Sequence, residues 1–351
     1  MNRHLFFTYA IIMLSICISF LSNAQKIIEI PINTKNTSLL KLSQIAESVS
    51  PIYLDRKIDW LQFLHFTDQS IFACGRTEIY QFTTSGEFVK KVDCKTDIQG
   101  ITGNSDTKEI YIAARDNTIK CYDYSLNKKK EYKTQHIPNA LFYHNKHIWI
   151  HSFVELNVGI GYTISKINII TGKETFNNLN AYNLNSAPKS TYGAVSEANF
   201  FTYNNELLIA PTMDSTIYKI EGDKISSFFN WRIKPKEGYY YYKPFVLSFK
   251  GITGNYIYIN YILRNSSDKY INNRRCFYLE NLKSGEKYNI NNTEEGPIYD
   301  DFYHTGYFNI ISLSNKPGYF YFIKEAAKIK QKANKINTNN KIVIFIVKTK
   351  E

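Results

Sequence analysis

The sequence predicts an all-β protein, and two observations carry this prediction. Aromatic residues make up 15% of the chain, with 28 Tyr and 23 Phe among 351 residues, and aromatic side chains are enriched in strands. A hairpin-like unit also recurs along the chain. In residues 79–92, "IYQFTTSGEFVKKV", two apolar runs flank a tight Ser-Gly turn. Several strands per repeat of about 40–50 residues are typical of a β-propeller, in which small sheets pack around a central axis.

The first element in the chain is a targeting segment at residues 1–24. Arg3 precedes an apolar stretch from Leu5 to Leu21, and small residues stand at Ser22 and Ala24. This pattern predicts a signal peptide that is cleaved before Gln25. An uncleaved anchor is the alternative, although the apolar core is short for a span of about 20 residues.

No second membrane signal is found, either as a lipid anchor or as a transmembrane segment. Cys17 follows Ile16 rather than a small residue, so a lipid anchor is not expected. After residue 24, no stretch is long and apolar enough to span a membrane, and no transmembrane segment is expected in the mature chain. We therefore expect an exported protein, located in the periplasm or at the cell surface.

Residues 25–351 are expected to form one propeller domain. The tight turn recurs with Gly or Asn, the residues that best tolerate positive φ in a hairpin. These turn residues are Gly86, Asn127, Gly172, Gly222 and Gly285. A sixth, interrupted copy starts at Gly318 and resumes at Lys341. Six copies predict a six-bladed β-propeller; a large β-sandwich is the alternative.

The two ends of the chain are expected to complete one blade together. A terminal blade alone would leave an unpaired strand edge, so we expect Val49–Leu54 to pair with Ile342–Val347. Within the last blade, residues 325–336 place apolar side chains on one helical face. This pattern predicts a short C-terminal helix inserted in the last blade.

The chain resembles the exported six-bladed β-propeller family common in Bacteroides-type gut bacteria, most of whose members have unknown function. Four stretches carry the resemblance: "LSQIAESVSPIYL" at 42–54, the hairpin at 79–92, "STIYKIEGDKI" at 215–225 and "IVIFIVKTK" at 342–350. The resemblance implies the fold and says little about activity. Two loops depart from the family pattern, at 92–106 and 299–306, so a family site in these loops would be altered here.

The charge of the chain permits an acidic partner without requiring one. The formal net charge is +12, which can attract anionic glycans, lipid headgroups or nucleic acid. AT-rich codon usage is the alternative explanation, because it also enriches Lys, Asn, Ile, Tyr and Phe. Export removes most access to nucleic acid, so we expect no nucleic-acid partner.

No metal or cofactor is expected. Cys74, Cys94, Cys121 and Cys276 match no zinc spacing, and whether any of them form a disulfide stays open. His147 and His151 would lie about 13 Å apart on a strand, too far to share one zinc ion. For Asp300 and Asp301, a solvated acidic turn is preferred over a calcium site.

The sequence contains no linear catalytic motif. The first functional hypothesis is therefore a non-catalytic binding module that uses the propeller loop face and central opening to hold a glycan, peptide or protein. A hydrolase or lyase acting on a small or saccharide ligand in the axial pocket is the alternative, and a purely structural role is the third possibility. The candidate binding residues stand at equivalent positions of the repeat, in the polar break that follows one strand of each copy. These residues are Arg76, Arg115, Asp116, His151, Asp214 and Arg264.

Overall fold

The computed structural model describes residues 26–31, 39–156, 159–177, 198–212, 215–234, 250–263, 274–291, 296–313, 315–326, 329 and 342–351. The expected signal peptide at 1–24 lies outside the described residues, as does most of the helix expected at 325–336. Within the described part of the chain, the one α-helix is the short α2 (Leu42–Ile45).

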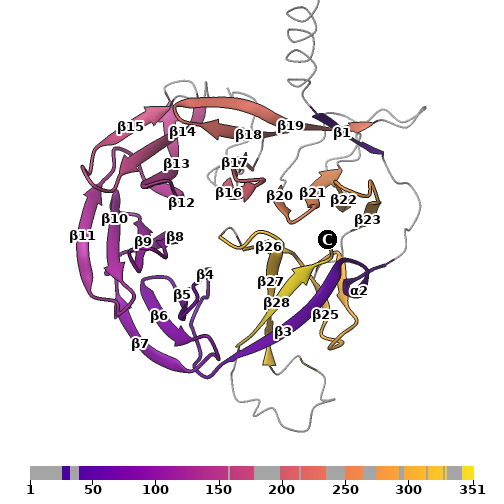
Figure 1. Ribbon diagram of the computed structural model, residues 1–351, viewed down its shortest axis with the longest axis horizontal. Helices are drawn as coiled ribbons and strands as arrows, with labels where there is room; N and C mark the ends of the chain where they lie inside the picture. The colour runs from indigo at the N-terminus through magenta and orange to yellow at the C-terminus, as the bar shows by residue number, and fades with distance from the viewer. Residues whose placement is uncertain are drawn as a thin grey trace, which may run out of the picture.

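The described strands form a ring of sheets, which is the arrangement of a β-propeller (Figure 1). We number the sheets as blades 1 to 7 in chain order from β4. Blade 1 is β4 (Phe63–Phe66), β5 (Ser70–Cys74), β6 (Glu78–Thr83) and β7 (Phe88–Asp93). Blade 2 is β8 (Ile98–Asn104), β9 (Glu109–Ala114), β10 (Thr118–Asp123) and β11 (Lys128–Lys133). Blade 3 is β12 (Pro138–His144), β13 (His147–Leu156), β14 (Gly159–Asn168) and β15 (Glu174–Asn177).

Blades 4, 6 and 7 each include a strand from the N-terminal part of the chain, and blade 5 is formed by consecutive strands. Blade 4 is β16 (Ala198–Tyr203), β17 (Glu206–Pro211), β18 (Thr216–Glu221) and β19 (Lys224–Lys234), with β1 (Lys26–Pro31) added in parallel beside β19. Blade 5 is β20 (Lys250–Thr253), β21 (Tyr256–Leu263), β22 (Arg274–Asn281) and β23 (Lys287–Asn291). Blade 6 is β24 (Ile298–Asp300), β25 (Gly306–Phe308) and β2 (Leu40–Lys41). Blade 7 is β26 (Ile311–Ser312), β27 (Tyr319–Glu325), β28 (Ile342–Thr349) and β3 (Ala46–Leu54).

The prediction of six blades is wrong, because the structure has seven sheets. Blade 6 consists of three short strands and contains no copy of the repeated Gly turn. Its Ile298 and Phe308 fill a core shared with Phe277 of blade 5 and Phe322 of blade 7. The repeated turn could not reveal this blade, because the blade lacks that turn and its three short strands lie between two full repeats.

The hydrophobic core is divided among the spaces between neighbouring blades. Between blades 1 and 2, for example, Phe72 and Ile79 pack with Ile110 and Ile112. Both faces of such a strand are buried, and every residue of β5 is buried. This is why β5 reads "SIFAC", a continuous apolar run, rather than an alternation of apolar and polar residues.

The prediction that the chain ends complete one blade is confirmed. Strands β28 and β3 pair in antiparallel fashion, with Ile342 opposite Leu54 and Val347 opposite Val49. The C-terminal strand thus lies between β27 and the N-terminal strand β3 (Figure 1). Hydrogen bonds across this pair close the ring and cover an edge that a linear array would expose.

The repeated turn also joins neighbouring blades. Gly86 (φ 95°) lies in the β6–β7 turn, and its carbonyl accepts a hydrogen bond from Asp55 N at 3.1 Å, just beyond β3 of blade 7. Gly172, Gly222 and Gly285 also have positive φ. The expectation for Asn127 is wrong: Leu126 takes the positive φ, and Asn127 N instead donates to Asp123 Oδ1 at 2.8 Å.

Replacing Gly86 with alanine is expected to destabilise the fold by about 2 kcal/mol. The new Cβ would meet the Tyr53 carbonyl oxygen at 2.2 Å, in addition to the strain of φ 95°. Gly222→Ala is the matched control, because nothing lies within 4 Å of its Cβ and only φ 58° resists the change. Urea unfolding should show a loss for Gly222→Ala of about 1 kcal/mol. Equal losses for the two variants would contradict the proposed contact between the turn and β3.

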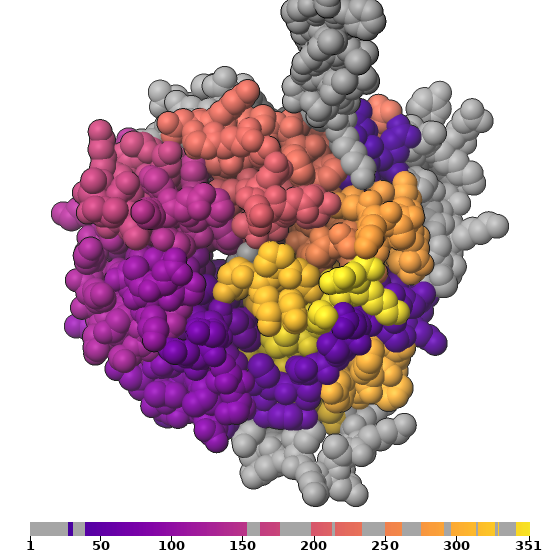
Figure 2. Space-filling view, in the orientation of Figure 1, coloured from indigo at the N-terminus to yellow at the C-terminus, as the bar shows by residue number. Residues whose placement is uncertain are grey.

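We call one face of the ring the loop face. It carries the connections from the second to the third strand of a blade and from one blade to the next. On the opposite face, first and second strands are joined by short turns such as 145–146, 204–205 and 254–255. The space-filling view shows a narrow opening near the middle of the ring, beside the yellow-orange last blade (Figure 2).

Candidate functional site

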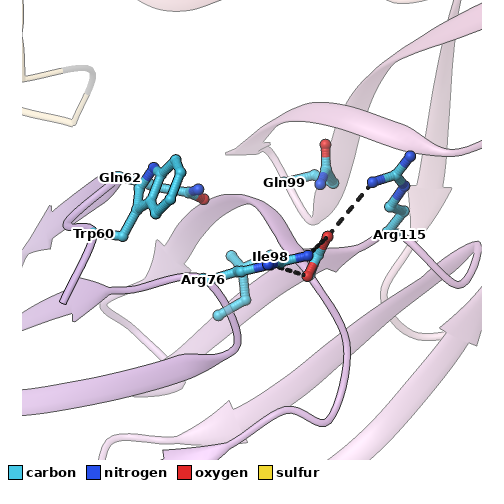
Figure 3. A pocket seen from close by; sticks show the side chains of 7 residues that line it. Trp60, Gln62, Arg76, Ile98, Gln99 and Arg115 are labelled. Atoms are coloured by element: carbon cyan, nitrogen blue, oxygen red, sulfur yellow. Dashed lines mark hydrogen bonds and ion pairs between the residues drawn. The ribbon is translucent and has the colours of Figure 1, made fainter.

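A pocket of about 390 Å³ lies on the loop face where blades 1 and 2 meet (Figure 3). Two of its side chains precede β4, one follows β5, three lie at the start of β8 and one follows β9. The lining residues are Trp60, Gln62, Arg76, Asp97, Ile98, Gln99 and Arg115. The volume is within the range of small-molecule sites, about 300–1,000 Å³.

Backbone hydrogen bonds hold the loops of this pocket in place. Ile98 N donates to the Arg76 carbonyl at 2.8 Å, and Arg115 N donates to the Asp97 carbonyl at 2.9 Å. Gln62 N donates to the Cys74 carbonyl at 2.9 Å. The backbone of the four connections is therefore tied to neighbouring segments before any side chain interacts, which positions their side chains around one space.

Two arginines share one carboxylate at the pocket. Arg76 Nε donates to Asp97 Oδ1 at 2.9 Å, and Arg115 Nη1 lies 3.5 Å from Asp97 Oδ2. The hydrogen bond from Arg76 lowers the pKa of Asp97, so the carboxylate is ionised at neutral pH. The arginine side chains are 68% and 66% exposed, and exposed ion pairs contribute only about 0–1 kcal/mol to stability.

Trp60 is the unusual residue of the pocket. It is 75% exposed, and its φ of 60° lies in the left-handed region. A bulky residue in this region is strained, and strained residues cluster at functional sites. Little burial of the indole offsets this strain in the free protein.

The pocket contains two of the six candidate binding residues, Arg76 and Arg115. Asp116 is next to Arg115 in the chain but pairs with Lys120 Nζ at 3.2 Å and accepts from Thr118 Oγ1 at 2.5 Å. His151 is fully buried in blade 3, with its ring 4.9 Å from that of Tyr162. Asp214 and Arg264 lie outside the described residues.

Sequence reasoning missed Trp60, Gln62 and Asp97, which belong to connections between blades, and Ile98 and Gln99 at the start of β8. The recognisable repeat begins at the second strand of each blade, so it does not include the first strand or the residues before it. Trp60 did carry a signal, because it directly follows "DRKID" (residues 55–59), a stretch in which four of the five residues are charged.

The acidic pair at 300–301 has structural roles. Asp300 is fully buried, so the expected solvated turn is wrong for this residue. Its side chain accepts from Thr305 Oγ1 at 2.7 Å and from the backbone N–H groups of Phe302 and Tyr303, each at 3.1 Å. Asp301 accepts from Ser43 N at 2.9 Å at the start of α2.

The described residues show no further arrangement for metal, disulfide or membrane chemistry. Within them, no group of three His, Cys, Asp or Glu side chains could hold a metal ion. Cys74, Cys94, Cys121 and Cys276 are buried thiols, and no disulfide occurs in the described part of the chain. Nor does any helix among these residues have the length and apolar character needed to cross a membrane.

Comparison with known proteins shows the fold alone. No family model and no curated protein matches the chain. A protein of Bacteroides fragilis NCTC 9343 that is named as exported is 11% identical, with a TM-score of 0.62, over 93% of this chain and 100% of that chain. BamB from Moraxella catarrhalis is 11% identical, with a TM-score of 0.46, over 86% of this chain and 99% of that chain. The chain has a β-propeller fold.

Proposed function

We propose that the protein is exported to the periplasm or cell surface and acts there as a non-catalytic binding module. The ligand enters the pocket between blades 1 and 2 on the loop face. Export is supported by the pattern of residues 1–24 and by the exported Bacteroides protein of similar fold. Membership in the exported propeller family of Bacteroides-type bacteria is part of the same proposal.

The conformation of Trp60 is the observation that supports binding most strongly. The residue bears a left-handed φ of 60° while 75% of its surface faces solvent. A ligand that covered the indole would supply the apolar contact that the free protein lacks. Large aromatic side chains contribute strongly at interfaces for this reason.

The charges of the pocket favour binding over turnover. Among the pocket-lining residues, Asp97 is the one carboxyl group, and its pKa is lowered by the hydrogen bond from Arg76. A general acid needs a pKa near the working pH, and Asp97 is shifted away from it. The alternative hydrolase or lyase therefore gains no support from this pocket.

Replacing Trp60 with glycine is expected to abolish binding without destabilising the protein. Glycine adopts φ 60° without strain, so the free energy of unfolding should stay unchanged or rise by about 1 kcal/mol. Binding is measured as the thermal shift of the chain from Gln25 with neutral oligosaccharides, acidic oligosaccharides and acidic peptides. A ligand at 100 times its dissociation constant adds about 2.7 kcal/mol of stability.

Asn205→Gly is the matched control for this experiment. Asn205 has a φ of 63° and is exposed in the β16–β17 turn on the face opposite the pocket. It should gain similar stability and keep every ligand-induced shift. A panel without any shift in the wild-type chain would contradict the small-ligand proposal and favour a protein partner.

A further inference from the structure

We propose that the ligand of this pocket is a saccharide bearing a carboxylate, such as a uronic-acid oligosaccharide. This inference rests on the proposed binding function and names its ligand class. The carboxylate of the sugar lies against the guanidinium groups of Arg76 and Arg115, and a sugar ring packs on the indole of Trp60.

The pocket lining carries more positive than negative charge, which favours an anionic ligand. It holds two guanidinium groups and one carboxylate, because Asp97 is the one acidic residue among the described residues that line the pocket. Arg76 uses Nε and Nη2 for this carboxylate, at 2.9 and 3.5 Å, whereas Arg115 approaches it with Nη1 at 3.5 Å. An arginine carries five N–H donors and can bind a carboxylate through two parallel hydrogen bonds. Arg115 therefore has the geometry to receive a second carboxylate while Asp97 keeps Arg76 in position.

The remaining side chains suit a sugar ring. Trp60 and Gln62 lie on one side of the pocket, Gln99 and Arg115 lie on the other, and Arg76 and Ile98 lie between them (Figure 3). The face of an indole packs against the C–H face of a pyranose, as an amphipathic aromatic ring does with any flat apolar surface. Each glutamine amide offers two donors and one acceptor oxygen for hydroxyl groups. An indole on one side of the pocket, a cation on the other and an amide on each side therefore match a ring that carries both hydroxyls and a carboxylate.

An acidic peptide matches the pocket less well. Extended peptides are usually held by backbone hydrogen bonds along a free strand edge. Here β4 and β8 are edge strands, but the pocket is lined mainly by side chains of the connections that precede or follow strands, and not along the length of either edge. The acidic peptide is nevertheless a separate arm of the test.

Calorimetric titration of the chain from Gln25 compares trigalacturonic acid with neutral galactotriose. We expect the acid to bind at least about 10-fold more tightly, because charge-assisted hydrogen bonds are about twice as strong as neutral ones. Added salt should weaken binding of the acid and leave the neutral sugar unchanged. Arg115→Ala should remove most of the preference for the acid, and Trp60→Gly should weaken binding of both sugars.

Lys130→Ala is the matched control, because Lys130 is exposed on β11 of the same blade and carries the same charge outside the pocket. It should change the affinity for the acid less than 2-fold. Arg76→Ala gives a second test if Arg115→Ala does not fold.

Three results would overturn the inference. If the two sugars bind equally, or if Arg115→Ala and Arg76→Ala both keep the preference for the acid, the pocket does not read the carboxylate, although the binding function stands. If acidic peptides bind through Arg115 and trigalacturonic acid does not, the ligand class is wrong. If no ligand of the panel binds, the inference fails together with the proposed function.

Discussion

Replacing Phe345 with alanine is expected to lower the free energy of unfolding by about 3–5 kcal/mol, the usual cost of truncating a buried phenylalanine. Phe345 is 1% exposed on β28, and its ring stacks on Phe322 with centroids 4.7 Å apart and contacts Tyr303 at 5.2 Å. The same residue pairs with Pro51 of β3. The cavity would therefore open in the blade that joins the two ends of the chain.

Denaturant unfolding, followed by tryptophan fluorescence and circular dichroism, measures this loss. Phe302→Ala is the control, because Phe302 is 43% exposed in the 300–306 loop and a surface truncation usually changes stability by less than about 0.5 kcal/mol. If Phe345→Ala lost less than about 1 kcal/mol, closure of the ring through β28 and β3 would not be part of the cooperative fold.

Acidification is expected to destabilise the protein by about 3 kcal/mol between pH 6.5 and 4, through His65 alone. His65 lies on β4 against β8, and a Cβ at Gly103 would meet its Nε2 at 2.4 Å. Burial lowers its pKa from 6.5 to about 4. The unfolded chain therefore binds a proton at a pH where the folded chain does not. Stability from the neutral ring is complete above pH 6.5 and is lost as the pH falls towards 4.

The window from pH 6.5 to 5 separates His65 from the carboxyl groups, which titrate at lower pH. About 2 kcal/mol should already be lost at pH 5. His65→Gln should flatten most of this dependence. Burial also lowers the pKa of His144, which leaves a smaller slope of the same sign. His304→Asn, at an exposed position, is the matched control for the substitution itself. A slope unaffected by His65→Gln would show that this ring is not buried in its neutral form.

The sequence predicted the repeating blades because each blade needs the same local chemistry. Strands buried on both faces are apolar over most of their length, as "IFAC" at 71–74 and "IYIAA" at 110–114 are, and the third and fourth strands are joined by a turn that requires positive φ. The pairing of β3 with β28 could also be predicted, since an open edge in a ring is unfavourable. The repeated strands and turns depend on hydrogen bonding and burial within one repeat, which a linear sequence records.

Blade 6 and the pocket depended on contacts between distant segments. One strand of blade 6 is supplied by Leu40 and Lys41, which pair with β24 over 250 residues later, and no local signal marks so short a pairing. In the same way, Trp60, Arg76, Asp97 and Arg115 come from four different connections. These four side chains share one site because blade 1 packs against blade 2. That packing brings the connections together independently of the sequences of the connections. The sequence by itself thus determined the kind of fold and the ring closure, and the tertiary structure alone decided the number of blades and which side chains share a site.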